Sequence, residues 1–192
     1  MPVQYSFFVN KIIRLLLLSD VWANLAAGML IPIYAIFVET IGGDILDASW
    51  AYFSFMISSG LVIFLVSKWE DRMKHKEKLV VLGGMLASLG YLQYIFVHNQ
   101  IGLIITQVVL GLSVSIRTPS YDALYSVHLD KNKEASEWGS WESMYFIVTA
   151  IAALLGGYVA STFGFKMLFS FMFLFSLISS TILIFYYRRK RN

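Results

Sequence analysis

Charged residues are scarce in this sequence. They make up 14% of its 192 residues, whereas hydrophobic residues make up 58%, and a soluble domain of ordinary composition carries about 25% charged residues. Cysteine is absent altogether, which excludes disulfide bonds and thiolate metal sites. The sequence also has no glycine-rich phosphate-binding loop, so nothing implies ATP or another cofactor. The composition predicts an integral membrane protein that needs neither metal nor cofactor.

Six long apolar segments divide the chain. A helix crosses a bilayer with about 20 apolar residues, and the segments cover about residues 12–38, 48–66, 79–97, 101–126, 140–161 and 167–187. We therefore expect an all-α polytopic membrane protein, with residues 1–192 forming a single domain of six transmembrane helices. The first segment follows Lys11 and Arg14 as a signal peptide would, but it contains Asp20 and runs too long, so we expect a retained helix. We expect a complete chain from Met1 and the basic tail, with a piece of a longer protein as the alternative.

The basic residues lie almost entirely on one side of these segments. All Lys and Arg residues except Arg117 and Lys166 fall in the N-terminal segment, in the connections 67–78 and 128–137, or in the tail 188–191. Positive charge marks the cytoplasmic side of a membrane protein. The sequence thus predicts a multi-pass protein of the plasma (inner) membrane with both termini in the cytoplasm. The same distribution explains the basic pI of about 9.0 without a nucleic-acid partner.

Arg117 stands in the middle of the fourth apolar segment. An arginine at that depth costs about 2.5–3.5 kcal/mol on insertion scales, so it should face protein or water and have a partner. Asp20 of the first segment lies at a similar depth and is the candidate partner. The pair would act either as a static salt bridge or in substrate or proton handling, with Asp122 and Glu142 as secondary candidates nearer the cytoplasm.

Polar side chains recur at helical spacing in three of the segments, namely the first, fourth and fifth. We expect these faces to surround a hydrophilic path. The segments 79–97 and 167–187 carry no charge within their apolar spans, and we expect them to form an outer pair. The residues predicted to line the cavity are Asn24, Tyr34, Ser113, Tyr121 and Tyr145.

The connection after the second segment carries a recognisable pattern. Residues 67–76 read SKWEDRMKHK, and Asp71, Arg72, His75 and Lys76 match the loop motif Gly-x-x-x-Asp-Arg/Lys-x-Gly-basic-basic. This motif after the second of six helices, together with cytoplasmic termini, resembles one half of a major facilitator superfamily transporter. The resemblance implies that these four residues form a gating loop and that helices one, two, four and five line a cavity. Serine and lysine replace the two motif glycines.

Two other motifs of that family are incomplete here. Gln107 stands where the fourth helix of the family has an arginine, so the role of that arginine does not pass to Arg117. The fifth segment contains AALLGG at residues 152–157, which is similar to the antiporter motif Gly-Pro-x-x-Gly-Gly but lacks its Gly-Pro. Uniport, symport and antiport therefore all stay open.

The resemblance implies secondary active transport of a small solute by alternating access. We expect two such halves to work as a parallel homodimer in the lipid bilayer, with proton coupling as an option. A hetero-dimer is open as well, and so is the identity of the solute. A passive channel or a non-transporting scaffold is the alternative. An enzyme is not expected, because all three histidines lie in connections and no Gly-x-Ser-x-Gly is present.

Overall fold

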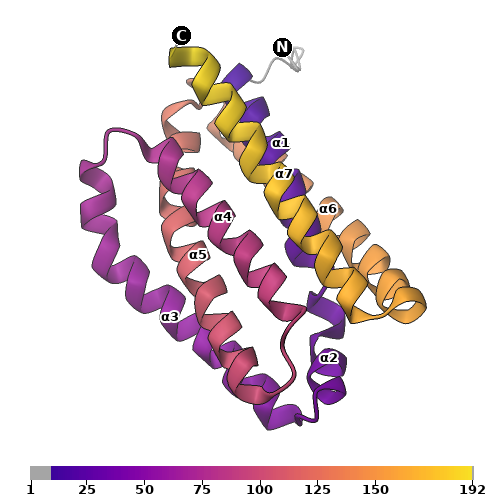
Figure 1. The fold of residues 1–192 in the computed structure, drawn as a ribbon. Helices are drawn as coiled ribbons and strands as arrows, with labels where there is room; N and C mark the ends of the chain where they lie inside the picture. Colours follow the sequence, from indigo (N-terminus) through magenta and orange to yellow (C-terminus); the bar gives the residue numbers. More distant parts are fainter. Residues whose placement is uncertain (1–9, 192) are drawn as a thin grey trace.

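The computed structural model describes residues 10–191, which fold into helices and short connections (Figure 1). Residues 1–9 and 192 of the predicted domain lie outside the described residues. The helices, listed in chain order, are α1 (Lys11–Gly28), the 3₁₀ turn η1 (Ile31–Ile33), α2 (Tyr34–Thr40), α3 (Ile45–Arg72), α4 (Lys76–Tyr94), α5 (Gln100–Val127), α6 (Glu134–Phe163) and α7 (Phe165–Arg191). The described part of the chain contains no strand.

The first predicted segment is interrupted rather than only bent. The α-helix ends at Gly28, and the chain resumes a helical path at Tyr34 after the 3₁₀ turn. Pro32 explains the break, because it has no N–H to donate to the preceding turn and its ring clashes with a continuing helix. The bond that remains runs from the Ile33 N–H to the Leu30 carbonyl, at 3.1 Å. The break places the Tyr34 side chain beside Gln107, in the N-terminal part of α5.

Two connections on one side of the molecule are fixed by side-chain caps. Asp44 and Asp47 form a capping box at the start of α3, in which each side chain accepts the other's backbone N–H. Asn99 caps α5 by accepting the Gly102 N–H at 2.9 Å. Such caps satisfy N–H groups that the first turn of a helix leaves unpaired. Both caps lie in connections that contain no Lys or Arg, so the charge distribution assigns them to the outside.

The helices pack as a bundle in which α5 lies against α3 and α4, and α7 lies against α4 and α1 (Figure 1). α6 packs on α1, and the two backbones come very close at Gly156, where an added Cβ would lie 2.7 Å from the Met29 Cα. Small residues permit such approach between membrane helices. α1 and α5 touch little, and the space between them becomes the pocket described below.

Five helical segments of the described chain are long and apolar enough to cross a membrane: Lys11–Thr40, α3, α5, α6 and the Phe165–Phe185 part of α7. α4 is not among them, since its first turn is charged and polar residues such as Gln93 lower its hydropathy. The prediction of a multi-helix apolar bundle is confirmed, and the sixth crossing stays a prediction.

The predicted outer pair, residues 79–97 and 167–187, is wrong for this chain. Both helices contribute side chains to the pocket, and α7 is as buried as α5, whereas α3 and α6 are the exposed helices. In the most apolar window of α3 and of α6 only 11% of residues are buried, against 39% in α5 and α7. The reason is a set of small residues that the apolar composition conceals: Ser88 of α4 donates to Ser176 of α7 at 2.9 Å, and Gly84 lies against Ser180.

Candidate functional site

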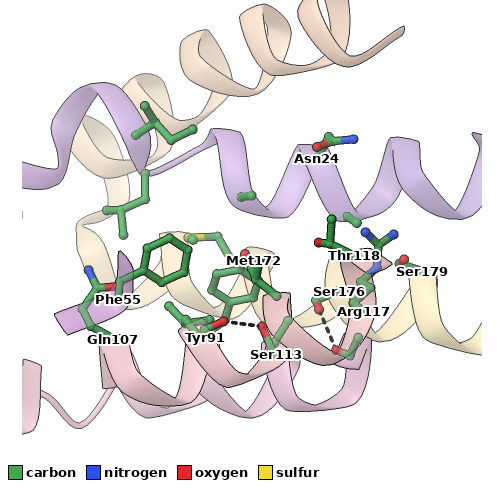
Figure 2. A pocket seen from close by; sticks show the side chains of 18 of the residues that line it. Asn24, Phe55, Tyr91, Gln107, Ser113, Arg117, Thr118, Met172, Ser176 and Ser179 are labelled. Carbon is green, nitrogen blue, oxygen red and sulfur yellow. Dashed lines mark hydrogen bonds between the residues drawn. The ribbon is translucent and has the colours of Figure 1, made fainter. Parts of the chain in front are cut away.

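A cavity of about 560 Å³ lies between α1, α3, α4, α5 and α7 (Figure 2). Pockets for drug-sized molecules have about 300–1,000 Å³ and are mostly apolar with a few placed polar groups. Most of the lining is apolar, and it includes six aromatic side chains, those of Tyr34, Tyr52, Phe55, Tyr91, Tyr94 and Tyr145. The pocket therefore has the size and the lining of a small-molecule site.

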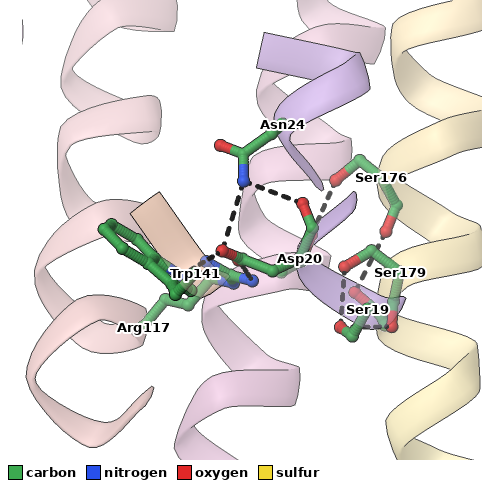
Figure 3. Close-up of polar contacts among 9 residues, drawn as sticks. Ser19, Asp20, Asn24, Arg117, Trp141, Ser176 and Ser179 are labelled. Carbon is green, nitrogen blue, oxygen red and sulfur yellow. Dashed lines mark hydrogen bonds and ion pairs between the residues drawn. The ribbon is translucent and has the colours of Figure 1, made fainter. Parts of the chain in front are cut away.

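A buried ion pair stands at one end of this pocket (Figure 3). Arg117 of α5 donates from Nη2 to Asp20 Oδ1 of α1 at 2.5 Å. The second carboxylate oxygen of Asp20 accepts from Trp141 Nε1 at 2.8 Å and from Asn24 Nδ2 at 3.2 Å. One carboxylate thus joins α1, α5 and α6, and all of these donors lie within hydrogen-bonding distance.

The two members of the pair differ in exposure. The Asp20 side chain is 4% exposed, whereas the Arg117 side chain is 19% exposed and lines the pocket. The Arg117 guanidinium carbon also lies 5.1 Å from the centre of the Tyr121 ring, within cation–π range. Asp20 therefore lies behind Arg117 as seen from the cavity, and the Arg117 side chain is the member of the pair that faces the cavity.

The approach of α4 to α5 fixes the position of Arg117. An added Cβ on Gly83 would lie 2.6 Å from the Arg117 Cβ and 2.7 Å from the Ser113 carbonyl oxygen. Any larger side chain at Gly83 would push α4 away from α5 at this point. The glycine thus holds the arginine backbone in a defined place beside Asp20.

The other end of the pocket carries a second polar contact. Gln107 Nε2 of α5 donates to the Tyr34 hydroxyl of α2 at 2.7 Å. Both residues line the cavity, and the bond ties the segment after the Pro32 break to α5. Position 107, where the family motif has an arginine, therefore holds a neutral amide, and Tyr34 is its hydrogen-bond partner.

Four of the residues predicted to line the cavity do so, namely Asn24, Tyr34, Ser113 and Tyr145. Tyr121 does not, and that prediction is wrong. Its ring is 2% exposed, lies against the Arg117 guanidinium and stacks on Tyr125 in a small core. Helical spacing placed it on the face of Arg117 but one turn beyond the end of the pocket.

The secondary carboxylates are not brought to the pocket. Asp122 is partly buried and Glu142 is exposed, and neither lines the cavity. Their role in substrate or proton handling stays a prediction, as does that of Asp20 and Arg117.

The predicted gating loop has local contacts at the end of α3. The Asp71 side chain is 85% exposed and lies 3.8 Å from Lys76 Nζ, and His75 Nδ1 lies 2.9 Å from Glu77. Arg72 is exposed as the last residue of α3. Surface ion pairs of this kind contribute about 0–1 kcal/mol, so these contacts leave the loop free to change partners.

Sequence reasoning missed two polar contacts of the site region. Trp141 reads as part of an apolar helix, although a buried indole N–H usually finds an acceptor, and that requirement is the signal that was available. Glu70 reads as a loop residue, yet it is 2% exposed and accepts from Ser120 at 3.2 Å, while its backbone carbonyl accepts from Lys76 Nζ at 2.8 Å. The Ser120–Glu70 contact joins the end of α3 to α5.

Comparison with known proteins gives a consistent result. Residues 16–192 match the sequence profile described as Major Facilitator Superfamily. An uncharacterized MFS-type transporter of Bacillus subtilis, YitZ, is 26% identical over 145 residues, which cover 75% of this chain and 87% of that protein. An uncharacterized MFS-type transporter of Methanocaldococcus jannaschii, MJ1560, is 25% identical over 147 residues, covering 77% of this chain but 38% of that protein. The chain thus spans well under half of the archaeal relative and most of the bacterial one.

Proposed function

Because the chain belongs to the Major Facilitator Superfamily, we propose that it carries a small solute across the membrane by alternating access through the pocket between α1 and α5. The observation that carries this proposal is the buried Asp20–Arg117 pair at the pocket's end. Ionisable groups inside a membrane protein are costly and mark substrate or ion pathways. Here the pair adjoins a cavity of suitable size, and its cation faces that cavity.

The transporter is proposed to work as a parallel homodimer. α3 and α6 are the least buried of the apolar helices, and large apolar side chains such as Phe64 and Leu154 stand 80% and 79% exposed on them. In a half-size chain these two helices offer the surface on which a second half would pack. The bacterial relative is also short, because 145 residues make up 87% of it.

Proton coupling would act through the same pair. Protonation of Asp20 would remove the negative charge that now neutralises Arg117, and the arginine would then attract an anion from the cavity. Uptake should therefore depend on pH, and Asp20→Asn should abolish that dependence. If uptake by the Asp20→Asn variant still depends on pH, Asp20 is not the proton carrier, and Asp122 or Glu142 remains as the candidate.

Transport is tested with purified protein in proteoliposomes. A thermal-shift screen first identifies binding solutes, because a ligand stabilises the folded state by mass action. We expect a binder to be taken up in a saturable manner and to exchange against unlabelled solute on the opposite side. Passive flux without saturation would contradict alternating access and favour a channel, and absence of flux would favour a scaffold.

The dimer is tested by cross-linking between separately expressed subunits. Gly60 of α3 and Phe146 of α6 are both exposed and lie at matching depth, about 12 residues or 18 Å from the same membrane side. Cysteines at these two positions should cross-link between chains in native membranes. A cysteine at Ala152, which is fully buried on α6, is the control and should not. A monomer in lipid with no cross-link from either position would end the homodimer model.

A further inference from the structure

We propose that the pocket binds an amphipathic organic anion, with its carboxylate at Arg117 and an aromatic or branched apolar body along the remaining wall. This inference rests on the proposed transport function and names the substrate class for it. It follows from where the charges of the pocket lie, from the unused donors of one side chain and from the chemistry of the wall.

The first argument is the sign of the charge. Among the described residues that line the pocket, Arg117 is the only charged one. Asp20 is not part of the lining, and its side chain is almost completely covered. A ligand in the pocket therefore meets a cation directly and meets the compensating carboxylate only behind it. A cationic ligand would be repelled by the same arrangement.

The second argument is the hydrogen-bonding capacity of the pair. Both oxygens of Asp20 are occupied, by Arg117 on one side and by Trp141 and Asn24 on the other. A guanidinium has five N–H donors in a planar fork that suits a carboxylate. Among the described residues, the Arg117 guanidinium makes one hydrogen bond, to Asp20. Donors thus remain for a second carboxylate, whereas Asp20 has little left to offer an ammonium group.

The third argument is the wall beyond the arginine. Figure 2 shows the Arg117 guanidinium at one end of the pocket near Thr118 and Ser179, with Phe55 and Met172 further along. Apolar and aromatic surface of this kind stabilises an apolar ligand body as it leaves water. A simple inorganic anion would leave this wall unfilled, and a sugar would place many hydroxyl groups against it without partners.

The test uses three probes that share one apolar body: biphenylacetate, biphenylacetamide and biphenylethylamine. Binding is measured by calorimetry on the full chain in lipid nanodiscs, with empty nanodiscs to subtract partitioning. The acid should bind about tenfold or more tightly than the neutral amide, which is the effect of one charge-assisted hydrogen bond. The amine should bind more weakly still.

Variants assign the preference to Arg117. Asp20→Asn should strengthen binding of the acid, because the competing carboxylate loses its charge while the arginine keeps its own. Adding Arg117→Gln to that variant should abolish the preference for acid over amide, and this double variant avoids an unpaired buried charge. Lys166→Gln removes the same charge from an exposed position at the start of α7 and should leave all three affinities unchanged.

The outcomes separate this inference from the transport proposal. Equal binding of acid and amide, preferred binding of the amine, no binding of the acid, or an acid preference that survives loss of Arg117 would overturn the anion assignment. If the acid binds as expected but proteoliposomes do not take it up, the transport proposal fails and the site assignment stands. If proteoliposomes take up a neutral or cationic solute and no acid preference exists, the anion assignment fails and the transport proposal stands.

Discussion

Removing one member of the Asp20–Arg117 pair should be costly, and removing both should not. Breaking a buried ion pair from one side costs about 3–5 kcal/mol, because the remaining charge is left without its counterion. Arg117→Gln leaves Asp20 almost fully buried with only the neutral donors of Trp141 and Asn24. We therefore expect a loss of about 3–4 kcal/mol in the free energy of unfolding, at the lower end of that range.

The opposite change should be milder. Asp20→Asn leaves Arg117 partly exposed to the pocket and in contact with the Tyr121 ring, so about 2–3 kcal/mol is expected. The double variant should lose no more than the milder single one. The double-mutant cycle then gives a coupling energy of at least about 3–4 kcal/mol, at or above the upper end of what contacting residues show.

The assay is equilibrium unfolding by SDS titration in mixed micelles, followed by circular dichroism. The ion pair between Lys133 and Asp130 serves as a matched control, since its side chains are 42% and 40% exposed. The same cycle there should give less than about 1 kcal/mol of coupling. Additive losses for Asp20 and Arg117, or single variants as stable as the parent, would refute the reasoning from burial.

Two further predictions concern packing and topology. Gly156→Ala should lower the free energy of unfolding by about 1–3 kcal/mol, since its Cβ would press on the Met29 backbone. Gly157→Ala is the control and should change stability little, because position 157 has open space around it. Equal effects of the two substitutions in thermal unfolding would argue against the α1–α6 contact. The chain has no cysteine of its own, so single cysteines can be labelled without background. A cysteine at Lys133 should react with impermeant maleimide only from the cytoplasm, and a cysteine at Asn99 only from outside. Labelling of the cysteine at position 133 in intact cells would overturn the orientation.

Elementary physics predicted the elements of the fold and one key contact. The long apolar runs match helices of the structure, although most helices extend several residues beyond them because their polar ends continue into water. The Asp20–Arg117 contact was expected because an arginine at mid-membrane depth needs a partner and only one carboxylate stood at that depth. Depth along a helix can be counted from the sequence, so this pairing was accessible.

The arrangement around that contact was not accessible in the same way. Helical spacing gives the face of a residue but not which helix that face meets. Tyr121 was therefore assigned to the pocket, and the contact of Trp141 with Asp20 was not predicted. Serine is equally compatible with a lipid-facing and a buried position, because it can donate to the carbonyl of its own preceding turn. The hydroxyl contacts between α4 and α7 therefore left no trace in the apolar composition, and the outer pair was misassigned.

The central claim, that this pocket opens alternately to the two sides, is tested most directly by the reactivity of one cysteine. Ala27 lines the pocket and its neighbour Ala26 is fully buried in the core, so Ala27→Cys is the probe and Ala26→Cys the control. In sealed vesicles of defined orientation, an impermeant thiol reagent should modify position 27 from either side without itself crossing the membrane, and should not modify position 26. Reaction at position 27 from one side only, under every condition that supports uptake, would contradict alternating access through this pocket.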